Sequence, residues 1–204
     1  IGSLSAMASS IAPRAIQMFR INNPKIKVTL QVMSSSAIRN MVADGLLDIG
    51  LAADEIDQAG VDVQLFASSP GVIALAPDHP LASEQSLSPS DIAHYPLIGL
   101  SPEDQARRRF ETAIRDAGFE PNVVVETPNS SAICALALSG DAIGLVNPLA
   151  TDGFPERGLI LRPFLPNVPF RSFIIFRPDI QKTRLVREYV AILYKLRNSI
   201  SLLK

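Results

Sequence analysis

Small polar side chains gather where predicted strands give way to predicted helices. A lone serine at such a point serves as a helix cap, because its side-chain oxygen accepts a hydrogen bond from an unsatisfied backbone N–H group. In a parallel α/β sheet, however, all strand-to-helix turns meet at one edge, and ligands bind at that edge. The serines form four sets, namely Ser3, Ser5, Ser9 and Ser10; Ser34, Ser35 and Ser36; Ser101; and Ser130 and Ser131.

The predicted edge indicates what kind of ligand it would hold. Helix N-termini favour anions, carboxylates among them, and hydroxyl groups are neutral donors. Asn129 opens one of these helices, and Asn147 and Pro148 close the predicted strand 142–146, which brings amide groups to the same edge. The sequence therefore predicts a small polar ligand that carries a carboxylate and is held mainly by neutral donors.

Two acidic residues open the helix that follows Ser101. Acidic side chains in a first helical turn ordinarily complement the helix dipole, and this is one interpretation of Glu103 and Asp104. The alternative is that one of them binds a cationic group of the ligand. The arginines at 107–109 are interpreted as a solvated basic face or as salt-bridge partners of these acids.

The residues favour binding over catalysis. His79 and His94 lie in turn segments outside any triad signature, and Cys134 lies in an apolar helix as a small buried side chain. The sequence lacks HExxH, GxxxxGK[ST], GxGxxG and GxSxG motifs. One cysteine excludes an internal disulfide and an all-cysteine metal site. We therefore expect no catalytic residue, no metal and no cofactor.

Alternating strands and helices must position these side chains. One helix carries an apolar stripe from Ala106 to Ala117 and stops at Gly118, a second covers 133–140, and the last repeats apolar residues every three or four positions from Leu185 through Tyr189, Ile192, Leu196 and Ile200 to Leu203. This alternation predicts an α/β fold with largely parallel sheets. Strands are expected at 1–4, 27–33, 49–53, 71–76, 97–99, 122–126, 142–146, 159–162 and 170–176.

Two proline-containing crossovers, at 68–71 and 176–179, divide the chain. The arrangement that fits is a first lobe made of 1–70 plus 177–204, with a second lobe, 71–176, inserted into it. The final helix then packs back on the first lobe. Two connections between lobes make a hinge, and a hinge predicts a ligand cleft.

Composition limits the partners. The chain has 204 residues, a net charge of −1, 47% apolar residues and 19% charged residues. A sequence pI of about 6.2 without a basic run argues against nucleic-acid binding by these residues. No apolar stretch approaches the roughly 18 residues of a membrane span. The lack of a possible disulfide fits a reducing, cytoplasmic compartment. The first residue is Ile1 and not Met, so we expect a fragment of a longer polypeptide.

Four segments in order resemble a known family. Together they are similar to the effector-binding domain of LysR-type transcriptional regulators, over essentially the whole chain. The segments are Ala12–Ala15 with Phe19 and Pro24, Met41–Leu51, His79–Ala82, and Ala142–Pro148. Three more resemble the opine-responsive regulators of that family, which sense octopine or nopaline, conjugates of arginine with a keto acid. These are Gln31–Ser36, Asp54–Val61 and Val146–Thr151.

The resemblance implies a fold and a function. It implies two Rossmann-like lobes, like type 2 periplasmic binding proteins, with a small-molecule effector in the cleft between them. It implies control of catabolic genes through an N-terminal winged helix-turn-helix that is absent here and alone binds DNA. It also implies homodimers, and tetramers of the full-length protein, with a pairing surface that includes the first helix, 7–22, and the strand and helix opposite.

The resemblance also implies contact residues. For an opine, the serine-rich turns suit the carboxylates, and Glu103 or Asp104 suits the guanidinium. Ala142 departs from the family, which commonly has glycine there, and a tighter turn beside Asn147 is expected. The implied contacts are Ser5, Ala6, Met7, Ser34, Ser35, Ala52, Ser101, Glu103, Asp104, Gln105, Ser130, Asn147 and Pro148.

Two alternatives share this fold. One is a solute-binding protein of an amino-acid or opine transporter, and the other is an enzyme such as a dehydratase. The segments 79–82 and 44–50 favour the regulator over the transporter protein. An enzyme would need a base in the cleft, and neither histidine is placed for that role.

Overall fold

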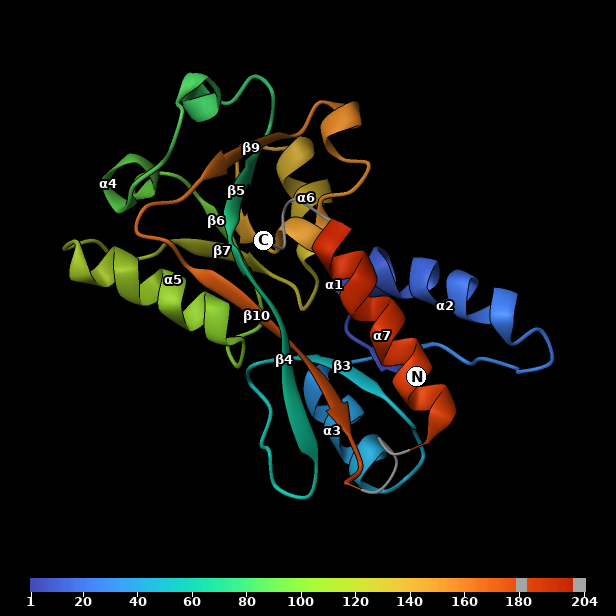
Figure 1. Cartoon of the computed structure of the whole chain (residues 1–204). Coiled ribbons are helices and arrows are strands. Elements are labelled where there is room, and N and C mark those ends of the chain that lie inside the picture. Colours follow the sequence, from blue (N-terminus) through green and yellow to red (C-terminus); the bar gives the residue numbers. More distant parts are fainter. Residues whose placement is uncertain (179–182, 200–204) are drawn as a thin grey trace. The chain divides into compact units, whose positions relative to one another are not determined.

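The computed structural model describes residues 1–178 and 183–199. It divides into two compact units, the first made of Ile1–Ser69 and Arg171–Lys204 and the second of Pro70–Phe170. The chain leaves the first unit along β4 (Asp62–Pro70) and returns along β10 (Pro169–Phe176), as Figure 1 shows. Among the described residues, no helix is long and apolar enough to cross a membrane.

A five-stranded mixed sheet forms the centre of unit 1. Its order is β2-β1-β3-β10-β4, with β1 at Gly2–Ser3, β2 at Gln31–Val32 and β3 at Gly50–Ala53. β1 is parallel to both β2 and β3, whereas β10 is antiparallel to β3. The helices of this unit are α1 (Ser5–Ala8), α2 (Ile11–Asn22), α3 (Ser35–Ala43) and α7 (Arg184–Ser199).

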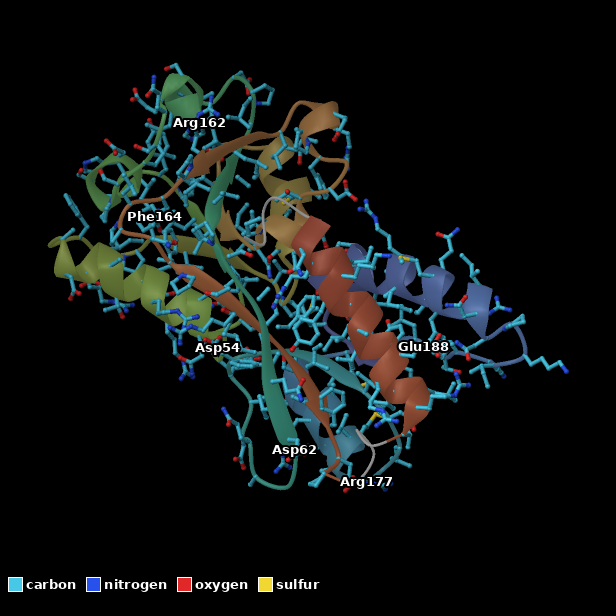
Figure 2. All side chains as sticks on the ribbon, in the orientation of Figure 1. Asp54, Asp62, Arg162, Phe164, Arg177 and Glu188 are labelled. Atoms are coloured by element: carbon cyan, nitrogen blue, oxygen red, sulfur yellow. The ribbon has the colours of Figure 1, made fainter. Side chains whose placement is uncertain are left out.

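Two packing contacts hold the unit 1 helices. Gly50 lets α3 close on the sheet, because a Cβ there would come within 2.6 Å of the Ile38 side chain. α2 lies along α7 (Figure 1). The ring of Phe19 meets the ring of Tyr189 edge to face, with 5.8 Å between their centres. The carboxylate of Glu188, labelled in Figure 2, accepts a 2.9 Å hydrogen bond from the Asn23 amide and so ties the two helices together.

The strands of unit 2 form one row. β8 (Gly144–Val146), β5 (Val72–Leu75) and β9 (Ile160–Pro163) pair antiparallel, and β6 (Leu97–Gly99) pairs parallel with β7 (Val123–Glu126). A parallel bridge between Leu97 and Ile143 joins the two sets, supported by a 2.8 Å bond from the Ile98 N–H to the Ile143 carbonyl. The row is therefore β7-β6-β8-β5-β9, and β6, β7 and β8 run in the same direction.

The remaining elements of unit 2 cover this row. Its main helices are α5 (Gln105–Asp116) and α6 (Ser130–Leu138), and their buried residues join one apolar core with the strands. Gly144 allows the closest approach, because a Cβ there would lie 2.4 Å from the Ile133 side chain. The short elements are α4 (Pro89–Ile92) and the 3-10 turns η1 (Pro80–Ser83), η2 (Pro148–Ala150) and η3 (Pro155–Arg157).

Two expectations from the sequence are wrong, and one strand was not expected. The sheets are mixed and not largely parallel, since β5, β9 and β10 run against their neighbours. The expected strand at 27–33 pairs only at Gln31–Val32. β4 was not predicted, because polar residues interrupt its apolar pattern.

The second boundary between the units also differs from the expected position. It lies between Phe170 and Arg171 instead of after Phe176, because β10 pairs with β3 from Ser172 to Ile175 and so belongs to the unit 1 sheet. The predicted positions Asp179, Ile200 and Leu203 lie outside the described residues.

Candidate functional site

Three strand ends meet at one edge of unit 1. Because β1 is parallel to both neighbours, the turns that follow β1, β2 and β3 lie at the same edge. The Leu4 N–H donates to the Leu51 carbonyl at 2.9 Å, and the Met33 N–H donates to the Ser3 carbonyl at 3.2 Å. The structure therefore brings together the predicted site residues of this unit, which follow or end these strands, namely Ser5, Ala6, Met7, Ser34, Ser35 and Ala52.

Two adjacent serines at the start of α3 accept different hydrogen bonds. Ser34 is the exposed N-cap, and its hydroxyl accepts a 3.3 Å hydrogen bond from the Ala37 N–H. Ser35 is buried, and its hydroxyl accepts a 3.0 Å bond from the Ala53 N–H. Ser35 thus fixes the end of β3 to the start of α3, while Ser34 faces solvent, where a ligand could reach it.

The turn after β1 exposes fewer of the predicted ligand-binding side chains than expected. The side chains of Ala6, Met7 and Ala52 are buried in the core of unit 1. Ser5 is partly exposed at the start of the four-residue α1, which has no side-chain cap. The Ser9 hydroxyl donates to the Ser5 carbonyl at 3.0 Å. Of the residues predicted in this turn, Ser5 is the one that presents a hydroxyl near the edge.

Unit 2 has a matching edge at the ends of its three parallel strands. The turns after β6, β7 and β8 carry Ser101, Thr127 and Asn147 in that order. The buried Ser130 hydroxyl accepts a 3.2 Å bond from the Asn147 N–H. The Asn147 side-chain oxygen accepts a 3.0 Å bond from the Leu149 N–H, so its NH2 group is the part that could serve a ligand. With alanine at position 142, Asn147 still makes these two hydrogen bonds within the protein.

The start of α6 has no side-chain cap. Asn129 is its N-cap residue but makes no capping hydrogen bond through its side chain, and its backbone N–H donates to the Thr127 hydroxyl at 3.3 Å. Backbone N–H groups of an uncapped first turn, aided by the helix dipole, favour a carboxylate. α6 therefore presents the first-turn N–H groups of Ser130 and Ser131 at this edge.

The two acidic candidates at α5 also differ. Asp104 caps the helix, and its carboxylate accepts bonds from the N–H groups of Ala106 at 2.8 Å and Arg107 at 3.0 Å. This matches the ordinary interpretation of an acid at a helix start. Glu103 is exposed and lies one residue earlier. Ser101, at the end of β6, and Gln105, the first residue of α5, are partly exposed.

The arginine run is not a solvated basic face. Arg107 is half-buried and pairs with Glu111 at 2.7 Å and Glu126 at 2.6 Å. Burial acts to lower the pKa of Arg107, but these hydrogen bonds outweigh burial and raise it. Arg108 donates to the Pro102 carbonyl at 2.9 Å, and Arg109 donates to the Pro169 carbonyl at 2.8 Å. The run therefore fastens α5 to its surroundings within unit 2.

The candidate bases lie away from these edges or are inert. β5 runs antiparallel to β8, so the turn after β5 that carries His79 lies at the opposite edge of the row. His79 is buried against Tyr95, and burial lowers its pKa. Burial raises the pKa of the Cys134 thiol to about 12. Within the described part of the chain, no three His, Cys, Asp or Glu residues are grouped as a metal site.

Sequence reasoning missed two polar residues at these edges. Asp54 directly follows β3 (Figure 2), and Thr127 directly follows β7. Both residues share the pattern of the serines, because each is a polar residue that directly follows a strand.

The comparisons with known proteins agree with this geometry. The family model of the LysR substrate binding domain matches residues 1–196. The chain belongs to this family. It is 28% identical over 193 residues to the regulatory protein NocR of Agrobacterium tumefaciens, covering 95% of the chain and 64% of that protein. It is also 28% identical over 166 residues to the octopine catabolism/uptake operon regulatory protein OccR of Rhizobium meliloti, covering 80% of the chain and 54% of that protein.

The chain thus spans less than two thirds of the length of these curated relatives. Their names describe regulators, which agrees with the prediction of a sensor and not an enzyme. Solved structures show the same fold. The cofactor-binding domain of the Cbl transcriptional regulator superposes with a TM-score of 0.85 at 20% identity, over 95% of this chain and 86% of that one. The BenM effector binding domain with benzoate gives 0.81 at 18% identity, over 100% and 93%.

Proposed function

We propose that this chain senses a small carboxylate-bearing effector for a LysR-type transcriptional regulator. The observation that carries the proposal is the shared construction of the two edges. In each unit, parallel strands end beside a helix start, and a buried serine holds the end of a neighbouring strand. In the proposal one effector engages both edges. The cleft between the lobes, predicted from the sequence, stays part of this proposal.

The effector class follows from the groups at the edges. The uncapped start of α6 suits a carboxylate, and the Ser34 hydroxyl and Asn147 amide supply neutral donors. Glu103 is an exposed acid at the second edge, suited to a guanidinium fork. An opine such as octopine or nopaline carries both groups, and the relative OccR is named for an octopine operon.

Calorimetry and thermal unfolding with octopine, nopaline and arginine test the effector class. We expect an opine to raise the melting temperature, because a ligand that binds only the folded state stabilises it by mass action. We expect arginine, which lacks the second carboxylate, to bind at least about tenfold more weakly, since one charge-assisted hydrogen bond contributes about 1.5–3 kcal/mol. Binding of arginine as tight as that of both opines would contradict the assignment.

Glu103→Gln tests the cation contact. The expected result is weaker opine binding with unchanged folding, because Glu103 is exposed. Glu84→Gln, at an exposed glutamate after η1, is the matched control. An unchanged affinity in Glu103→Gln would remove this residue from the site.

Self-association is proposed through two sheet edges. β2 is one of the two edge strands of the unit 1 sheet and exposes Val32, and Ile21 is exposed on α2. β7 ends the row of unit 2 and exposes Val124, and Leu136 is exposed on α6. We propose that α2 and β2 of one copy pair with α6 and β7 of another in a homodimer, and that the full-length protein forms tetramers.

Sedimentation tests the dimer. Leu136→Asp should shift the chain to monomer, whereas Leu165→Asp, at an exposed leucine after β9, should leave the dimer intact. A wild-type chain that sediments only as monomer at high concentration would contradict pairing by this domain alone.

In the proposal, DNA is bound by an N-terminal helix-turn-helix of the longer protein, and the protein acts in the cytoplasm.

A further inference from the structure

Arg107 contacts the ends of two parallel strands in unit 2. One terminal nitrogen of its guanidinium donates to the Leu100 carbonyl, directly after β6, and the other lies 2.6 Å from the carboxylate of Glu126, the last residue of β7. Its Nε donates to Glu111 at 2.7 Å, one turn further along α5. All three guanidinium nitrogens therefore have acceptors within the protein, so we do not expect Arg107 itself to contact the effector.

Both strand ends lead directly into the candidate site of this unit. Leu100 precedes Ser101, and Glu126 precedes Thr127. The Thr127 hydroxyl accepts a 3.3 Å hydrogen bond from the N–H of Asn129, the N-cap residue of α6. A single side chain of α5 thus connects the turn that carries Ser101 with the turn that leads to the uncapped start of α6.

Few other contacts hold these two turns together. β6 has only three residues, and its last paired position joins Gly99 to Glu126. Beyond that pair, the Thr127 N–H donates to the Gly99 carbonyl at 3.0 Å. The guanidinium of Arg107 lies beside Gly99, because a Cβ at that glycine would come within 3.4 Å of the Arg107 Cζ atom. Arg107 therefore supports the strand pair at the place where its ladder ends.

The ion pairs of Arg107 differ in exposure. The side chains of Arg107 and Glu111 are 11% and 15% exposed, whereas that of Glu126 is 51% exposed. A half-exposed ion pair contributes little to folding stability, because water screens it and solvates either partner. The contact with Glu126 can therefore be removed without unfolding unit 2, and its effect on the turns can be measured by itself.

We propose that Arg107 is a positioning residue for effector binding, which holds Ser101 and the first turn of α6 in their binding positions before the effector arrives. This inference rests on the proposed function, since it concerns the same edge of unit 2. A site that is ordered in advance binds more tightly, because the ligand does not have to order the turns itself. Loss of the contact between Arg107 and Glu126 therefore weakens binding and leaves the unit folded.

Hydrogen exchange of the chain without ligand tests the positioning. In Glu126→Ala, the Thr127 and Asn129 N–H groups should exchange at least about threefold faster, because the turn opens locally more often. The melting temperature should fall by less than about 4 °C. Glu120→Ala is the matched control, because Glu120 is an exposed partner of Arg115 and lies before the start of β7. Unchanged exchange in Glu126→Ala would overturn the positioning role.

Octopine titration by calorimetry, well below the melting temperature, tests the effect on binding. We expect Glu126→Ala to bind octopine about three- to tenfold more weakly, the cost of ordering one or two side chains on binding. Glu126→Gln keeps an acceptor oxygen for Arg107 and should recover most of this loss, whereas an effect of the Glu126 charge alone would make the two variants alike. Faster exchange combined with wild-type octopine affinity in Glu126→Ala would overturn the link between positioning and binding.

Arg107→Lys keeps the charge but offers one nitrogen in place of three, so it cannot make all three contacts. It should bind octopine about three- to tenfold more weakly. Adding Glu126→Ala should then change the affinity by less than about twofold, because both residues act through one contact. Losses that add would overturn this shared role. A wild-type chain that binds no octopine would instead contradict the proposed function, and the exchange result would then decide the positioning alone.

Discussion

The start of α3 in unit 1 and the start of α6 in unit 2 share one hydrogen-bonding arrangement but differ in whether a side chain caps the helix. In both, the first helical residue is a buried serine that accepts a hydrogen bond from the strand-end N–H of a neighbouring strand, Ser35 from Ala53 and Ser130 from Asn147. α3 also has a side-chain cap, Ser34, whereas α6 has none. The shared serine hydrogen bond fixes a strand end beside the helix start in each unit. Because α6 lacks a side-chain cap, its first-turn N–H groups are the ones suited to a carboxylate.

Removing the buried acceptor of unit 2 should have the largest effect. Ser130→Ala leaves the buried Asn147 N–H without its partner, which should lower the free energy of unfolding by about 1–3 kcal/mol. It should also weaken effector binding, because Asn147 would no longer be held at the edge. Urea unfolding and calorimetry measure the two effects, with Ser131→Ala as control. A smaller loss of folding stability in Ser130→Ala than in Ser35→Ala would contradict the expected difference between the two units.

The same change in unit 1 should cost less. Ser35→Ala removes the acceptor of the Ala53 N–H, but this bond is only partly buried, so water can replace the hydroxyl in part. We expect a loss of about 1 kcal/mol in urea unfolding. Ser36→Ala, at the exposed next position, is the control and should be close to neutral. A neutral Ser35→Ala would show that the two serines do not share a role.

The sequence predicts the positions of these serines but not their hydrogen-bond partners. The serine sets and the strand ends at Gly99 and Val146 are predictable because small polar caps follow short apolar runs. The different roles within each set are not predictable, because Ser34 and Ser35 are the same residue type and differ only in which backbone N–H lies nearby. The sequence places Tyr189 in an apolar stripe, but it does not show that the Tyr189 hydroxyl is buried without a partner, because that depends on tertiary packing.

The cap itself should have a smaller effect. Ser34→Ala removes the side-chain acceptor of the Ala37 N–H and should destabilise unit 1 by up to about 1 kcal/mol. Asn129→Ala in unit 2 removes no capping bond, so its folding stability should change less. Equal losses in the two variants, measured by urea unfolding, would remove the difference between the helix starts.

The pH dependence of unit 2 should give the smallest effect and sharpen the comparison further. Burial acts to raise the pKa of Glu111, but its bonds to Arg107 and Arg115 outweigh burial and lower it. A lowered folded-state pKa contributes stability above the unfolded-state value of about 4.3, and this stability is lost as the pH falls through the folded-state pKa. Glu111→Gln should therefore be less stable than wild type at pH 7, and the difference should shrink in acid. A difference that stays constant between pH 7 and pH 3 would contradict the ion pair.

NMR titration of the chain with octopine tests the central claim most directly. If an effector is bound by both strand-end edges, the backbone N–H signals of Ser130 and Ser131 should move downfield as they donate to a carboxylate, and those of Ser34 and Ser35 should move in the same titration. Saturable binding that leaves the signals of both helix starts unchanged would contradict the account.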